Sequence, residues 1–228
     1  MKTVKLICFI FLIISLRISS ANDIDFEEIQ PGIFVHQGEH HDIDENYDGD
    51  ICNVGFIIGD ESVAVIDTGG SPAIGQKILN AIKEKTSLPI RFVINTHVHL
   101  DHIYGNIAFL DEDPIYIGHS ELPKAMKLRK SYYEKINQDF LGLSAKDSVQ
   151  VIPTVLVKAK EIKEIDLGNR ILKIEAYPKA HTNTDITIED INTKTAWLGD
   201  LLFTERTPSI DGDIHGFIDA LDVRKNKN

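Results

Sequence analysis

The stretch Thr96-His97-Val98-His99-Leu100-Asp101-His102 decides how this chain is interpreted. It places three imidazoles and one carboxylate within six positions, directly after the apolar run 91–95. A strand ending there would deliver the following side chains to a loop at the edge of a sheet. Imidazole nitrogens and carboxylate oxygens bind zinc at about 2.0–2.2 Å. Because buried polar groups need partners, the cluster favours a metal site over a surface loop with chance histidines.

Two polar residues further along the chain extend the candidate site. His181 lies beyond a predicted strand at 171–176, and Asp200 follows the apolar stretch 196–198. Taken singly, either residue would be interpreted as an ordinary loop residue. Because every candidate ligand follows a strand, we expect all of them at one edge of the sheets.

Strands alternate with helices along the sequence, and some strands pair as hairpins. The Val- and Ile-rich segments 53–58 and 62–67 predict a hairpin. Isoleucines recur every four residues at 74, 78 and 82, which predicts a helix capped by Ser71. We predict a charged surface helix at 121–137, a solvated charged stretch at 158–163, and further strands at 33–35, 91–95, 115–117, 171–176, 187–188 and 196–198. This pattern is typical of one α+β domain.

The N-terminus has the layout of a secretory signal peptide at residues 1–21. Lys2 and Lys5 precede the apolar run Leu6–Leu16, and the small residues Ser19-Ser20-Ala21 follow. The run is shorter than the about 20 residues that a membrane span needs, although an uncleaved anchor is an alternative. We therefore expect a periplasmic or secreted domain at 22–228, with no membrane attachment after cleavage.

The net charge argues against one class of partner, and the cysteine content argues against an internal disulfide. The formal net charge of −11 argues against nucleic acid, because phosphate contacts need clustered Lys and Arg. We expect a small-molecule substrate, and the sequence does not indicate the oligomeric state. Cys8 lies in the predicted signal peptide, so Cys52 would be alone in the mature chain, without an internal disulfide. We interpret Cys52 as a small buried residue, not as a nucleophile or zinc ligand.

From about Ile33 to Asp219, the sequence resembles the metallo-β-lactamase fold superfamily. The motif H-x-H-x-D-H matches 97–102, and the residues at 67, 181 and 200 also fit the pattern. The resemblance implies a four-layer αββα sandwich that holds two zinc ions. The implied ligands are His97, His99 and His181 for one ion, Asp101 and His102 for the second, and Asp200 bridging both. Asp67 would accept hydrogen bonds that orient the ligands.

The sequence is similar in more detail to the quinoprotein relay system zinc metallohydrolases, a periplasmic branch. The shared strings are Gln37-Gly38 with His40, Asp50-Ile51, 53–59, 199–203, Arg206, Pro208 and 210–212. This likeness implies hydrolysis of an ester, thioester or amide by a zinc-bound hydroxide, linked to quinoprotein or sulfur-compound oxidation. Asp101 would orient the hydroxide, and Asp200 would tie the two metals together. The alternatives are a β-lactamase and a non-catalytic accessory or binding protein.

One departure from the family pattern concerns the second zinc. Family members carry a further histidine after the position of Asp200, as the last ligand of that ion. Here the only later histidine is His215, whose setting resembles a helix start. We therefore expect a sandwich that lacks its C-terminal strand and helix, with one tight zinc and a weaker second one. The histidines at 36, 40 and 41 are interpreted as a solvated loop, and His119 as support for the fold.

Overall fold

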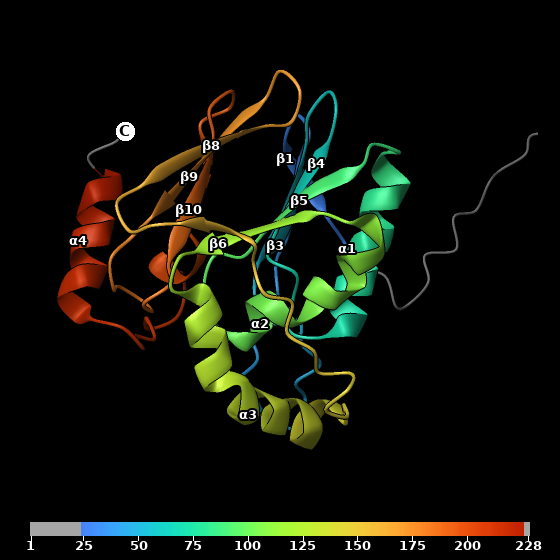
Figure 1. Cartoon of the computed structure of the whole chain (residues 1–228), viewed down its shortest axis with the longest axis vertical. Coiled ribbons are helices and arrows are strands. Elements are labelled where there is room, and N and C mark those ends of the chain that lie inside the picture. Colours follow the sequence, from blue (N-terminus) through green and yellow to red (C-terminus); the bar gives the residue numbers. More distant parts are fainter. Residues whose placement is uncertain (1–23, 226–228) are drawn as a thin grey trace, which may run out of the picture.

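The structure, a computed structural model, describes residues 24–225. The predicted signal peptide at 1–21 lies outside these residues. Two β-sheets form the centre of the molecule, with α1 on one outer side and α4 on the other (Figure 1). The chain has the expected α+β fold, and its layers follow from where the apolar side chains lie.

The larger sheet has seven strands in the order β1 to β7. Their bounds are Glu27–Gln30, Ile33–His36, Val54–Ile58, Val63–Ile66, Ile90–Ile94, Ile115–His119 and Val155–Val157. The first four strands pair antiparallel, and β4 to β7 pair parallel. Parallel neighbours need a crossover, and helices supply it here. These helices are α1 (Pro72–Lys85), α2 (Leu100–Ile103) continuing into η1 (Tyr104–Glu112), and α3 (Leu122–Leu141).

The smaller sheet is antiparallel, with its strands in the order β11-β10-β9-β8. Its strands are β8 (Ile162–Asp166), β9 (Ile171–Ala176), β10 (Ile186–Asp190) and β11 (Thr195–Trp197), followed by η2 (Gly199–Leu201) and α4 (Ile214–Lys225). Burial alternates along β9, so that every second side chain is fully covered. This alternation is typical of a sheet with one face on the core.

Two apolar layers hold these sheets in place. Between the sheets, Ile57 and Ile94 of the larger sheet pack in one cluster with Ile174 and Ile188 of the smaller sheet. On the outer face of the larger sheet, Phe56, Val65 and Val93 share a cluster with Ile74, Ile78 and Ile82 of α1. The predicted helical face is confirmed, because all three isoleucines are buried. Strand β4 is covered on both faces, which explains its unbroken apolar sequence.

Several elements differ from the sequence prediction. Strands β1 and β7 and the helix η1 were not predicted, and the charged stretch 158–163 runs into strand β8. That stretch is exposed as expected up to Ile162, and of the five residues of β8 only Ile165 is buried. After β11, the described chain contains η2 and α4 but no further strand. No helix among the described residues is long and apolar enough to cross a membrane.

Candidate metal centre

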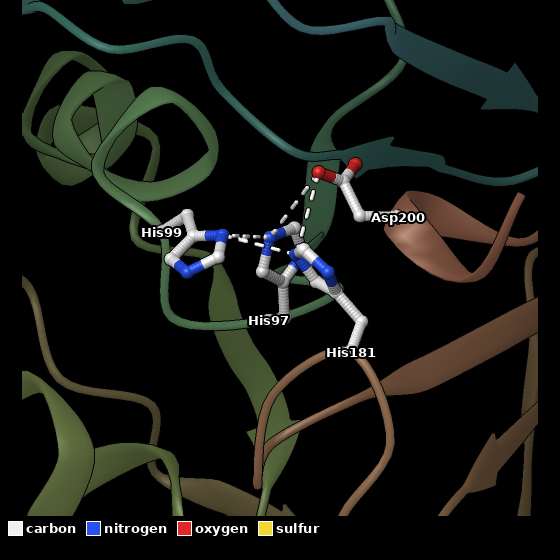
Figure 2. A group of neighbouring side chains, drawn as sticks. All are labelled: His97, His99, His181 and Asp200. Atoms are coloured by element: carbon white, nitrogen blue, oxygen red, sulfur yellow. Dashed lines mark hydrogen bonds and ion pairs between the residues drawn. The ribbon is translucent and has the colours of Figure 1, made fainter. Parts of the chain in front are cut away.

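Four segments of the chain bring the predicted site residues together. The loop after β5 carries His97 and His99, and α2 follows it directly with Asp101 and His102. The loop between β9 and β10 carries His181, and Asp200 lies in η2 after β11. Figure 2 shows three of the imidazoles and the Asp200 carboxylate pointing toward one another. The centre therefore draws side chains from both sheets.

His97, His99, His181 and Asp200 form the first of two clusters, which we call the histidine cluster. His99 Nδ1 lies 3.1 Å from His97 Nε2 and 3.0 Å from His181 Nε2. Asp200 Oδ2 lies 3.8 Å from His97 Nε2 and 3.4 Å from His181 Nε2. Ligands at about 2.1 Å from a tetrahedral ion lie about 3.4 Å from one another. The four atoms thus have the spacing of a zinc ligand set.

The outer nitrogen of each imidazole in this cluster faces an oxygen acceptor. The contacts run from His97 Nδ1 to Thr96 Oγ1 (3.1 Å), from His99 Nε2 to Asp211 Oδ2 (3.4 Å), and from His181 Nδ1 to the Ser209 carbonyl (2.6 Å). Each outer nitrogen donates its proton, so the inner nitrogen carries a lone pair. Lone pairs about 3 Å apart repel unless a cation lies between them. Such outer hydrogen bonds are typical of metal-binding histidines.

Cys52, Asp101 and His102 form the second cluster, the cysteine cluster. His102 Nε2 lies 3.4 Å from Asp101 Oδ2 and 3.5 Å from Asp200 Oδ1. Cys52 donates from Sγ to the Asp101 carbonyl over 2.8 Å. One oxygen of Asp200 faces each cluster, which is the arrangement that a bridging carboxylate requires.

Asp67 accepts three hydrogen bonds beneath the two clusters. They come from the Thr96 backbone N–H (2.8 Å), the Thr96 hydroxyl (2.6 Å) and His102 Nδ1 (2.8 Å). Asp67 follows β4, and Thr96 follows the parallel neighbour β5, so the two strand ends meet at one sheet edge. The Asp67 backbone has a φ of 56°, in the left-handed region that Asp and Asn tolerate best among residues with a Cβ.

Burial and charge set the protonation of the site. Burial, followed by the neighbouring imidazoles, holds the pKa of His97 well below its usual value. Burial also lowers the pKa of His99 and His181, so all three favour the neutral form that binds metals. Burial raises the pKa of Asp200. In His102, burial acts to lower the pKa, but the surrounding Cys52, Asp101, Asp67 and Asp200 raise it well above its usual value. The centre thus carries excess negative charge that a divalent cation would neutralise.

The sequence analysis missed several groups that position the ligands. Arg129 of α3 donates to Asp211 Oδ2 over 2.6 Å, and this aspartate also accepts from His99. Asp211 lies in the string 210–212 that supported the finer family likeness. Arg129 is one of several charged residues on a surface helix, and nothing in the sequence indicated that it contacts the site. Thr96 lies in the opening motif, although only the fold shows that its hydroxyl connects His97 to Asp67.

The remaining histidines lie apart from both clusters. His36 pairs with Asp50 at 2.9 Å, and the histidines at 40 and 41 are exposed. His119 is buried at the end of β6, where Nδ1 accepts from the Glu121 backbone and Nε2 donates to the Tyr177 carbonyl, so it supports the fold as expected. His215 is exposed near the start of α4.

A cavity of about 290 Å³ reaches the centre from the side of β11. Asp67, His102 and Asp200 contribute to its wall, together with Trp197 and Leu198. Small molecules from solvent can therefore approach Asp200 from the side that carries His102.

Comparison with known proteins places this geometry in context. A family profile described as the metallo-β-lactamase superfamily matches residues 47–227. A solved metallo-β-lactamase from Hirschia baltica is similar with a TM-score of 0.68 at 17% identity, over 90% of this chain and 85% of that one. The structure of TMB-1 gives a TM-score of 0.67 at 15% identity, over 90% and 84%. Identities this low show the fold alone.

Among curated proteins, a linear primary-alkylsulfatase from a Pseudomonas species is 34% identical over 58 residues. That segment is 25% of this chain and 11% of the length of the alkylsulfatase. The likeness is thus local and leaves most of the relative unmatched.

Proposed function

Because the chain belongs to the metallo-β-lactamase superfamily, we propose that it is a zinc-dependent hydrolase of an ester, thioester or amide. One observation carries the proposal: two buried imidazoles and one part-exposed imidazole converge with their outer nitrogens hydrogen-bonded, which leaves three inner lone pairs for one ion. A chance cluster of surface histidines would have no reason to fix all three outer nitrogens.

His97, His99 and His181 would hold a first zinc ion, and Asp101 with His102 a second one, with Asp200 between them. When bound, zinc acts as a Lewis acid and lowers the pKa of water from about 15.7 to about 7. Asp101 is part-exposed, with the pKa of its carboxyl lowered because His102 and His99 outweigh its burial. Asp101 can therefore accept a hydrogen bond from the attacking water and orient it. No serine or cysteine nucleophile is needed.

The alkylsulfatase likeness favours a second candidate substrate, a sulfate ester of a primary alcohol. The short strings shared with quinoprotein relay zinc hydrolases support a role near sulfur-compound oxidation in the periplasm, which would require export through the predicted signal peptide. A β-lactamase activity has weaker support, because the solved metallo-β-lactamase from Hirschia baltica shares only the fold with this chain.

The test is to strip metal from the purified protein, restore zinc, and measure zinc content and hydrolysis together. The substrates are an aryl ester, an acyl thioester, a primary alkyl sulfate and the β-lactam nitrocefin. We expect hydrolysis of at least one ester or thioester, lost on chelation and restored by zinc. His97→Ala should abolish it, whereas the matched change His40→Ala alters an exposed histidine and should leave it intact.

Two results would contradict the proposal. Dialysed protein without zinc and unable to rebind it would eliminate the metal centre. Zinc-loaded protein that hydrolyses none of the four substrates would favour the non-catalytic binding protein instead.

A further inference from the structure

Cys52 lies at a place that the metal-binding motif does not account for. It precedes β3 and has only 5% of its surface exposed. Its Sγ, one carboxylate oxygen of Asp101 and one imidazole nitrogen of His102 all lie within 4.8 Å of one another. A buried thiol beside two other donors has the composition of a metal site, but proximity alone would not establish one.

His102 supplies the independent observation. Its Nδ1 donates to Asp67, so Nε2 is the ring nitrogen that can bind a metal ion, once that ion displaces the proton which the surrounding acids favour on the ring. This Nε2 is buried and has no hydrogen-bond partner within residues 24–225. It faces Asp101 Oδ2 at 3.4 Å and Asp200 Oδ1 at 3.5 Å, and ionised carboxylates have no proton to donate. A buried ring nitrogen that faces two carboxylates without a hydrogen bond is costly, and a metal ion bound among the three groups would satisfy all of them.

The distances leave one position of a tetrahedron open. The two His102 contacts match the about 3.4 Å expected between tetrahedral zinc ligands, and a thiolate at about 2.3 Å from zinc would lie about 3.6 Å from the others. Cys52 Sγ lies within 4.8 Å of the other two ligand atoms, so it is at most about 1 Å farther from them than a zinc-bound thiolate would be. To reach that position, Sγ would have to give up its hydrogen bond to the Asp101 carbonyl.

We propose that Cys52 Sγ is a ligand of the second metal ion, together with Asp101, His102 and the outer oxygen of Asp200. The proposal rests on the metal dependence proposed above and specifies how the second site is completed without a later histidine. Binding releases the thiol proton to solvent. A thiolate-containing set selects thiophilic ions such as zinc over magnesium, calcium or manganese.

Cobalt(II) titration of metal-free protein tests the proposal directly, because a cobalt–thiolate bond gives a charge-transfer band in the near ultraviolet. The full chain carries Cys8→Ser, so that Cys52 is the only thiol. We expect the first equivalent to give only visible d–d bands from the histidine cluster. The second equivalent should add the charge-transfer band. Adding Cys52→Ser should remove that band and weaken the second ion more than about 100-fold, beyond the 10–100-fold typical of losing an outer partner.

The possible failures are distinguishable. Two bound equivalents without the charge-transfer band, or unchanged binding in Cys52→Ser, would overturn the role of Cys52 and leave the proposed hydrolase standing. No bound cobalt at all would overturn both proposals. If the Cys52→Ser protein does not fold, the rate at which an alkylating reagent modifies Cys52 in the Cys8→Ser protein is measured instead. The second zinc equivalent should slow that alkylation more than about tenfold, and an unchanged rate would refute the ligand role.

Discussion

At the scale of single residues, the centre depends on which nitrogen of each imidazole keeps its proton. Asp67 shows how the fold controls this choice, because its carboxylate accepts from both Thr96 and His102 Nδ1. The accepted proton is fixed on the outer nitrogen, so the inner nitrogen is available as a ligand. A neutral amide at this position could not accept all three hydrogen bonds.

Asp67→Asn tests this role with little change in shape. Asn also tolerates the left-handed backbone, so the turn should form. Its amide nitrogen cannot accept from His102, and we expect zinc bound through His102 to weaken by about 10–100-fold. Titration against a chelating dye measures the change. Asp60→Asn, at an exposed carboxylate, should leave the affinity unaltered, and equal affinities in both variants would refute the role of Asp67.

At the scale of elements, close backbone contact places the loop that carries the histidines. Helix α1 lies against η1 through Gly75 and Gly105, and a Cβ on Gly75 would collide with the Gly105 carbonyl. A Cβ on Gly105 would in turn collide with the Thr68 carbonyl. Thr68 also donates to Asn106, which accepts a second hydrogen bond from Asn95 just before the motif. The contact between α1 and η1 therefore fixes the chain both before the candidate ligands, at Asn95, and after them, at Gly105 and Asn106.

For Gly75→Ala, helix propensity and packing predict changes of opposite sign in the free energy of unfolding. Propensity alone would stabilise the protein by about 1 kcal/mol. Because the collision is with backbone, which cannot rotate away, we expect instead a loss of about 1–3 kcal/mol in the free energy of unfolding. Urea denaturation measures it, and Glu84→Ala on the exposed face of α1 should stay within about 0.5 kcal/mol. A more stable Gly75→Ala protein would show that α1 and η1 are not in close contact.

At the scale of the whole molecule, a buried ion pair joins the two sheets at the strand ends opposite to the candidate metal centre. Arg170 donates to both oxygens of Asp190 within the smaller sheet, at 3.0 and 3.2 Å. It also donates to the carbonyls of Pro31, in the turn between β1 and β2, and of Ile58, in β3 of the larger sheet, at 2.9 and 2.8 Å. Since the candidate ligands come from both sheets, this cross-link helps to fix their relative position.

Arg170→Met should lower the free energy of unfolding by about 3–5 kcal/mol, because it leaves the buried Asp190 charge without its partner. Burial acts to raise the pKa of Asp190, but the bonds from Arg170 and Thr193 lower it. Its stabilising contribution is thus complete above the ordinary Asp pKa of about 3.9 and is lost as the pH falls through the lower folded value.

The difference between the two proteins should therefore narrow as the pH falls below about 4. Denaturation curves collected from pH 7 to pH 3 measure this difference. Lys173→Met alters a part-exposed cation on the neighbouring strand and serves as the control. A difference independent of pH would show that Asp190 carries no charge in the native protein.

The sequence by itself determined the elements with strong local patterns. The spacing of histidines after the apolar run, the four-residue recurrence of Ile74, Ile78 and Ile82, and the strands at 53–58 and 62–67 are all local features, set by periodicity and burial. Strand β1 could not be predicted, because its four side chains are all exposed and its pairing with β2 defines it.

The tertiary structure alone decided which distant groups share the centre. It placed Cys52 beside His102, Asp211 beside His99, and the two oxygens of Asp200 toward different clusters. Each of these contacts joins segments that are far apart in the sequence, so the local pattern of either segment does not predict the contact. The physical reason is that side-chain convergence depends on sheet order and loop path, which are set by the packing of the whole chain.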